Sequence, residues 1–292
     1  GSGILRAVGD SRRPLYFLIF SALVNTVLDI VFVRDLNMGI AGAAIATLLS
    51  QCVSLCILAS FFLLKKSDLR VSPSCISRSP KLYLSILKQG MPSFFRQGIL
   101  SLSTMALNFN AKIYGDAAVA ALAIVTKVFT FIQSIVIGFG QGFQPVCGFN
   151  FGAKRYDRVR GATYFTMLVG TVLMSVLAAA GFLAAPGALA LFRRDDAEVI
   201  AIGALALRAQ CVVLPLFGVS TVTNMLLQVT GQSGQATFLS LCRQGIFFVP
   251  FMLLLPQLIG LLGVQLAQPA ADLCTFAVTL PFLLSFLRRL KL

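Results

Sequence analysis

Charged and amide side chains inside long apolar segments are the residues of this chain that could do chemistry. Arg96, Lys127 and Arg243 each lie in a segment that is otherwise mostly apolar. Removing a charge or an amide from water is costly unless it is paired, so such side chains are candidates for binding a ligand or lining a polar cavity. The candidate cavity residues are Arg96, Gln97, Asn108, Asn110, Lys127, Gln141, Gln144, Asn224, Arg243 and Gln244.

The spacing of these residues predicts helices with one polar side. At about 100° per residue, Arg96 and Asn110 fall within about 40° of each other on a helix over residues 89–114. Lys127 and Gln141 share a face of the next segment in the same way. We interpret these faces as the polar wall of a cavity. The alternative is that the residues tie neighbouring helices together by hydrogen bonds.

Two carboxylates in apolar segments are candidates for coupling to an ion. Asp29 lies late in the first segment, one helical turn after Asn25, and Asp272 follows Pro269 in the last segment. A carboxylate inside a membrane protein can take up a proton or bind a cation. The alternative for both residues is a structural role as hydrogen-bond acceptors between helices.

The residue types that are missing exclude several kinds of chemistry. The 292 residues include no histidine and no tryptophan, and only ten are acidic. Histidine-based acid–base catalysis, His-ligated metal sites and Ser–His or Cys–His arrangements are therefore excluded. No G-x-x-x-x-G-K-[ST] pattern for binding nucleotide phosphates occurs. We expect neither an enzyme nor a bound metal or cofactor.

The composition indicates an integral membrane protein. Hydrophobic residues make up 58% of the chain and charged residues only 12%, about half of the roughly 25% that soluble domains carry. The formal charge of +14 does not indicate a nucleic-acid partner. Most Lys and Arg residues stand in short runs between long apolar stretches, as membrane topology requires.

Eight segments are long and apolar enough to span a membrane, since a spanning helix needs about 20 mainly apolar residues. Sixteen Lys and Arg residues lie in one set of loops and ends, and only three lie on the other side. The positive-inside rule predicts a multi-pass protein of the inner (plasma) membrane with both termini in the cytoplasm. The segments are 14–33, 39–64, 89–114, 117–141, 161–185, 199–227, 238–258 and 261–287.

An internal repeat predicts the domain organisation. ILRAVGDSRRPLYFL at 4–18 is similar to LLQVTGQSGQATFL at 226–239, and both precede a helix, a tight turn and a Gly-rich helix. We therefore expect an all-α bundle with eight helices of a twelve-helix, two-lobe transporter that is truncated at its N-terminus. Residues 1–65 would form the last two helices of the first lobe, 66–88 a cytoplasmic linker, and 89–292 the second six-helix lobe.

The run GFGQGFQPVCGFNFGAKRYDRVR at 138–160 combines glycines, amides and basic residues. Its glycines permit a tight turn after the helix that ends near residue 141, with Gln141 and Gln144 at the cavity floor. This run resembles a loop of the multidrug and toxic compound extrusion (MATE) family. GMPSFFRQG at 90–98 and CRQGIFFVP at 242–250 also resemble that family, in particular its prokaryotic branch related to DNA-damage-inducible protein F.

The resemblance implies a cation-coupled exporter that works by alternating access. We expect an antiporter that exports amphipathic organic compounds in exchange for H⁺ or Na⁺. Its partners would be a small amphipathic substrate and membrane lipid, and the protein would be a monomer. The alternatives are a lipid-linked glycan flippase of the wider superfamily, which a basic cavity would suit, and a non-transporting membrane fragment. By resemblance, the coupling carboxylate would lie in the first helix of the first lobe, and Arg96 puts a second-lobe sodium site in doubt.

Overall fold

The computed structural model describes residues 2–7, 10, 12–63, 79–193 and 196–289. Within these ranges the chain is helical and contains no strand. It divides into two compact units, Gly1–Pro80 and Lys81–Leu292. The expectation of an all-α membrane bundle is confirmed.

The first unit is a hairpin of two long helices. α2 (Arg12–Asp29) continues into a π-helical segment, η1 (Ile30–Asp35), and α3 (Gly39–Leu63) packs against it. A short helix, α1 (Ser2–Ala7), precedes them. Gly39 takes up the sharp change of direction with a φ of 56°, a conformation that costs glycine little.

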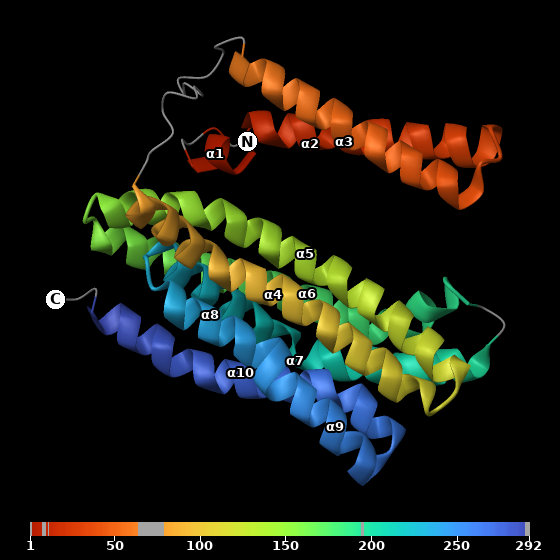
Figure 1. The fold of residues 1–292 in the computed structure, drawn as a ribbon. Helices are drawn as coiled ribbons and strands as arrows, with labels where there is room; N and C mark the ends of the chain where they lie inside the picture. Colours follow the sequence, from red (N-terminus) through yellow and green to blue (C-terminus); the bar gives the residue numbers. More distant parts are fainter. Residues whose placement is uncertain (1, 8–9, 11, 64–78, 194–195, 290–292) are drawn as a thin grey trace. The chain divides into compact units, whose positions relative to one another are not determined.

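The second unit is a bundle of long helices that run side by side (Figure 1). Its fifth membrane-spanning stretch is continuous but has three parts, because a π-helical segment joins two α-helices. The elements are α4 (Pro80–Lys112), α5 (Asp116–Gly152), α6 (Tyr156–Ala190), α7 (Ala197–Val229), α8 (Ser233–Leu241), η3 (Cys242–Phe247), α9 (Phe248–Ile259) and α10 (Leu261–Arg289).

The helix α7 is the centre of this second unit, since it packs against α5, α6 and α10. The apolar core forms two separate clusters along the bundle. One contains Val125, Leu207 and Met252, and the other contains Phe143, Leu226 and Phe286. The second cluster lies toward the end of the bundle that carries Lys154, Arg155 and Arg288, which we call the basic end. Polar side chains occupy the layer between the two clusters.

Seven of the described helical stretches are long and apolar enough to cross a membrane. They correspond to seven of the eight expected segments. The remaining segment, 89–114, lies in α4, which has 33 residues but carries several Ser, Gln and Lys side chains that lower its hydropathy. α4 also begins at Pro80, so the last part of the expected 66–88 linker is helix. Residues 64–78 of that linker lie outside the described part of the chain.

The expected turn after residue 141 is wrong, because α5 continues as a helix to Gly152. Two glycines of this run serve close packing between helices. A Cβ at Gly140 would collide with Met225, and one at Gly148 would lie 3.2 Å from the Val229 side chain. Glycine at these two positions lets α5 approach α7, whereas a Cβ at Gly138, Gly142 or Gly152 would have no atom within 4 Å.

A tight approach also fixes the turn between α9 and α10. Gly260 has a φ of 62°, and a Cβ at Gly263 would overlap the backbone of Leu255 and Pro256. We predict that Gly263→Ala lowers the free energy of unfolding by about 1–3 kcal/mol, because the backbone must move to admit the methyl group. Thermal unfolding of the purified protein in detergent measures this.

The matched control for that change is Gly187→Ala in α6, where no atom lies within 4 Å of the added Cβ. We expect its melting temperature to stay the same or rise slightly, because alanine restricts the unfolded chain more than glycine does. Equal melting temperatures for both variants would contradict the packing described at Gly263.

Candidate functional site

An ion pair lies in the polar layer of the second unit. Nε of Arg243, in η3, donates to Oδ1 of Asp272, in α10, at 2.7 Å. The amide of Gln268 donates to the same oxygen at 3.1 Å. The ring of Phe217 covers one face of the guanidinium group, with its centroid 4.4 Å from Cζ. The Arg243 side chain is 15% exposed and that of Asp272 only 3%, so the pair is shielded from solvent.

The helix that carries Arg243 contains a proline about two turns further on. Pro250 has no N–H group, and its ring clashes with the carbonyl four residues earlier, at Ile246. The π-helical segment η3 immediately precedes this part of the helix, and such segments often occur at functional sites. The Ser103 hydroxyl, from α4, donates to the carbonyl of Gln244 in this segment at 2.8 Å.

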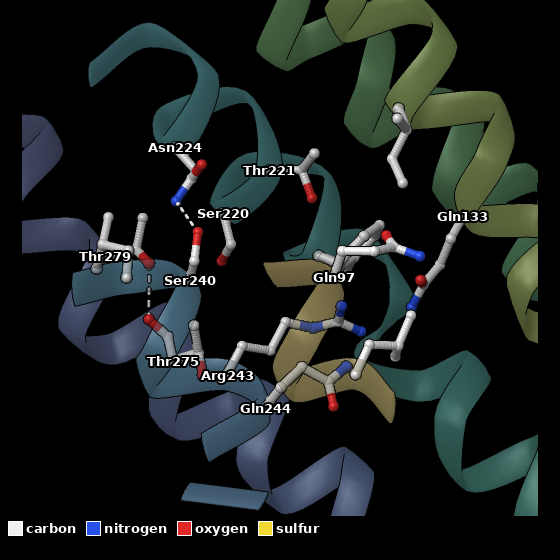
Figure 2. A pocket seen from close by; sticks show the side chains of 14 residues that line it. Gln97, Gln133, Ser220, Thr221, Asn224, Ser240, Arg243, Gln244, Thr275 and Thr279 are labelled. Carbon is white, nitrogen blue, oxygen red and sulfur yellow. Dashed lines mark hydrogen bonds between the residues drawn. The ribbon is translucent and has the colours of Figure 1, made fainter. Parts of the chain in front are cut away.

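Two cavities meet at this ion pair. The larger has a volume of about 230 Å³ and the smaller about 70 Å³. Leu100, Gln133, Arg243 and Gln244 line both. Figure 2 shows the guanidinium group of Arg243 pointing into the larger cavity, toward Gln97 and Gln133. The larger cavity is lined by Gln97, Leu100, Gln133, Ile137, Phe217, Ser220, Thr221, Asn224, Leu239, Ser240, Arg243, Gln244, Thr275 and Thr279.

Several buried polar atoms around the pair have no partner within the described ranges. They include Nη2 of Arg243 and Oδ2 of Asp272, so the ion pair uses one contact where a guanidinium and a carboxylate can form two. The side-chain oxygens of Gln210 and Gln265 at the smaller cavity are also unpartnered. Buried polar groups normally have partners, which makes this layer the part of the structure with the most unused hydrogen-bonding capacity.

Helix α4 is attached to the rest of the second unit at three levels by polar side chains. Besides Ser103, the Tyr114 hydroxyl donates to the carbonyl of Pro256 at 3.2 Å. At the basic end, the amide of Gln228 donates to the carbonyl of Gln89 at 3.0 Å and to the Ser93 hydroxyl at 3.2 Å. These contacts fix the position of α4, which contributes lining residues to both cavities.

The structure brings only some of the candidate residues to the cavity. Gln97, Asn224, Arg243 and Gln244 line it. Asn224 is held by the Ala236 carbonyl at 2.7 Å and by the Ser240 hydroxyl at 3.0 Å. The side chain of Arg96 lies outside the described part of the structure.

Five other candidates lie elsewhere, so the single polar face expected for each helix is not one cavity wall. Asn108 and Lys127 are exposed and line neither cavity. Asn110 is buried and donates to the Ala106 carbonyl of its own helix at 3.0 Å. Gln141 and Gln144 lie further along α5 toward the basic end, where Gln144 donates to Gln228 at 3.5 Å. A helix of this length passes several levels of the bundle, and the two cavities at the ion pair lie at only one of these levels.

Sequence reasoning missed Gln133, which lines both cavities from α5. It lies one residue before Ser134, and a systematic search for amides in apolar helices would have found it. The hydroxyls of Ser220, Thr275 and Thr279 were also missed. Ser and Thr are common in membrane helices, so their presence alone is a weak signal. The pairing of Arg243 with Asp272 was missed as well, because the two residues lie on separate elements.

Asp29 and Asn25 form a separate polar site in the first unit. Oδ1 of Asp29 and Nδ2 of Asn25 are buried and have no hydrogen-bond partner among the residues the structure describes. The two side chains stand one turn apart on α2, and Asn25 also lines a cavity of about 350 Å³ between α2 and α3. Among the described residues, no three His, Cys, Asp or Glu side chains stand close enough to hold a metal ion together.

Comparisons with known proteins agree with this helical architecture. The multidrug export protein MepA of Staphylococcus saprophyticus is 24% identical over 276 residues, which are 94% of this chain and 60% of that protein. MepA of Staphylococcus haemolyticus is 24% identical over 275 residues, again 60% of its length. The chain thus spans about 60% of the length of these relatives.

Solved structures show the same fold. A MATE in complex with MaL6 has a TM-score of 0.92 at 24% identity, covering 99% of this chain and 66% of that one. A Pyrococcus furiosus transporter of the MOP superfamily, described as having a binding pocket of reverse polarity that suggests a different function, has a TM-score of 0.91 at 25% identity, covering 100% and 66%. The MatE family model matches residues 92–254, more than half of the chain. On this match and on its fold, the chain belongs to the MatE family.

Proposed function

We propose that this protein is a secondary active antiporter that exports amphipathic organic compounds in exchange for protons or sodium ions by alternating access. The observation that carries the proposal is the cavity between membrane-spanning helices, which combines apolar walls with a few polar groups. Leu100, Ile137 and Phe217 supply apolar surface, and Gln97 and Gln133 supply amides. Ligand sites for amphipathic molecules have this mixed lining. The MepA relatives are named multidrug export proteins, which supports the same activity.

The ion pair between Arg243 and Asp272 helps to choose between Asp29 and Asp272 as the carboxylate that couples transport to an ion. Asp272 already faces the Arg243 guanidinium at 2.7 Å, so an incoming cation would have to displace a fixed positive charge. Asp29 has a buried oxygen with no partner in the described part of the chain. We therefore place ion coupling at Asp29, with Asn25 as its neighbour, and assign Asp272 to holding Arg243.

A lipid-linked glycan flippase is the second candidate. The guanidinium group of Arg243 at the cavity wall favours an anionic ligand, as the head group of such a lipid would be. The Pyrococcus furiosus transporter with a pocket of reverse polarity supports the idea that this fold serves ligands of different charge. Export of a water-soluble dye that has no lipid anchor separates the two functions.

We predict that cells expressing the protein accumulate less of a cationic amphipathic dye than cells carrying an empty vector. Export should stop when an ionophore collapses the proton or sodium gradient, because a secondary transporter has no other source of energy. Dye fluorescence in energised and de-energised cells measures this. Equal accumulation with and without the protein at confirmed membrane expression would contradict the proposal.

We predict that Asp29→Asn abolishes gradient-driven export while the protein still reaches the membrane. The amide keeps the shape of the side chain but cannot take up a proton or supply a negative charge. Export at a series of imposed pH and sodium gradients measures the coupling. The control is Asp35→Asn, which changes an exposed carboxylate at the end of η1 and should leave export unchanged. Normal export by the Asp29 variant would place coupling elsewhere.

The charge distribution predicts an inner-membrane protein with its basic end in the cytoplasm. In a variant without native cysteines, Ala153→Cys in the turn between α5 and α6 should be protected from an impermeant maleimide in intact cells. Ala197→Cys, at the start of α7 on the opposite end of the bundle, should react. The reverse labelling pattern would overturn the orientation.

A further inference from the structure

The larger of the two cavities at the ion pair presents positive charge and no negative charge. Arg243 lines both cavities, whereas Asp272 lines neither. No other acidic side chain lines either cavity within the described ranges. The ion pair is therefore oriented, with its guanidinium end toward the cavity (Figure 2) and its carboxylate end in the protein. A ligand in the cavity meets the donor end of this pair.

The guanidinium group also has unused donors. Its Nε is occupied by Asp272, whereas in the described part of the chain Nη1 makes no hydrogen bond and Nη2 is buried without a partner. Phe217 covers a face of the group at 4.4 Å, which leaves the in-plane N–H groups free to bond. A guanidinium group carries five such donors in a planar fork that fits the oxygens of a carboxylate or phosphate. Gln97 and Gln133 add amide donors beside it.

We propose that the larger cavity binds an oxyanion of the transported molecule, a carboxylate or a phosphate, at the guanidinium group of Arg243. The proposal rests on the proposed function and specifies the chemistry of its substrate. A volume of about 230 Å³ is below the roughly 300–1,000 Å³ of sites that enclose a drug-sized ligand. The cavity therefore takes the oxyanion end of an amphipathic molecule and not the whole of it.

The net charge of the site further limits which classes of ligand it favours. Arg243 and Asp272 together are neutral, so an oxyanion adds one uncompensated negative charge to a region of low dielectric constant. A ligand that carries its own positive charge avoids this cost. The favoured substrates are zwitterions with a free carboxylate, or zwitterionic phosphate compounds, over simple organic cations.

Two dyes that differ at one group test the proposal. One is a xanthene dye with a free carboxylate, which is a zwitterion, and the other is the methyl ester of the same dye, which is a cation. Binding of each to the purified protein in detergent is measured by fluorescence anisotropy. We expect the carboxylate form to bind about tenfold more tightly, as a hydrogen bond to a charged group allows. Equal binding of the two dyes would overturn the proposal.

The variants assign the preference to Arg243. Arg243→Gln combined with Asp272→Asn removes the guanidinium group without leaving a buried carboxylate unpaired, and the two dyes should then bind equally. Asp272→Asn alone frees the guanidinium group from its partner, so the preference for the carboxylate should increase. Arg208→Gln is the matched control, because Arg208 also stacks on a ring, that of Phe182 at 5.4 Å, but lines neither cavity.

The melting temperature of each variant shows whether it is folded. A folded double variant that keeps the carboxylate preference would overturn the assignment. An unchanged or reduced preference in a folded Asp272→Asn variant contradicts the proposal as well. If neither variant folds, the comparison of the two dyes on the wild-type protein still decides, because equal binding contradicts the proposal. Export of the methyl ester by the wild-type protein is measured separately, so failure of the exporter function is distinguished from failure of the oxyanion site.

The source of the oxyanion is distinguished in lipid nanodiscs. Binding of the carboxylate dye is compared between phosphatidylcholine and phosphatidylcholine with phosphatidic acid. Competition by phosphatidic acid in the wild type but not in the double variant supports the site with a lipid phosphate as its ligand. No competition, with the dye preference intact, supports the site with a carboxylate compound. Equal competition in both proteins shows that lipid acts elsewhere and contradicts a lipid phosphate at Arg243.

Discussion

The pairing of Arg243 with Asp272 is the interaction on which the second unit depends. An unpaired arginine in the middle of a helix bundle would be costly to bury, and removing one partner of a buried pair typically destabilises by about 3–5 kcal/mol. The pair joins the π-helical segment η3 to α10, and Phe217 of the first apolar cluster packs its ring on the guanidinium group. The ion pair keeps polar side chains between the two apolar clusters.

In this arrangement, most residues that stabilise the bundle are different from the polar residues that line the cavity. The central helix α7 contributes Leu207 and Phe217 to one apolar cluster and Leu226 to the other, while Ser220 and Thr221 of the same helix line the cavity and belong to neither cluster. Cavity residues such as Ser220 and Thr221 can therefore differ in polarity without disturbing either cluster. A transporter that must bind different molecules on a constant scaffold benefits from such a division.

The sequence predicts the fold and its candidate residues better than it predicts their partners. Hydropathy located the helices because a span of apolar residues is a local property, and it singled out Arg243 for the same reason. The contact between Arg243 and Asp272 depends on how η3 and α10 pack, and no spacing rule relates residues on separate elements. The run after residue 141 was misjudged because glycine serves both turns and close helix packing. Only the approach of Met225 to Gly140 distinguishes these two uses.

The attachment of α4 has a consequence for sequence drift. Ser103, Tyr114 and Gln228 each supply a side-chain donor, and each finds a main-chain carbonyl as acceptor, at Gln244, Pro256 and Gln89. Every residue type carries a carbonyl, so the side chains at the three acceptor positions can be exchanged without loss of these bonds. Only the three donors are constrained by this attachment. Distant relatives can thus hold the same helix in the same place with little sequence in common.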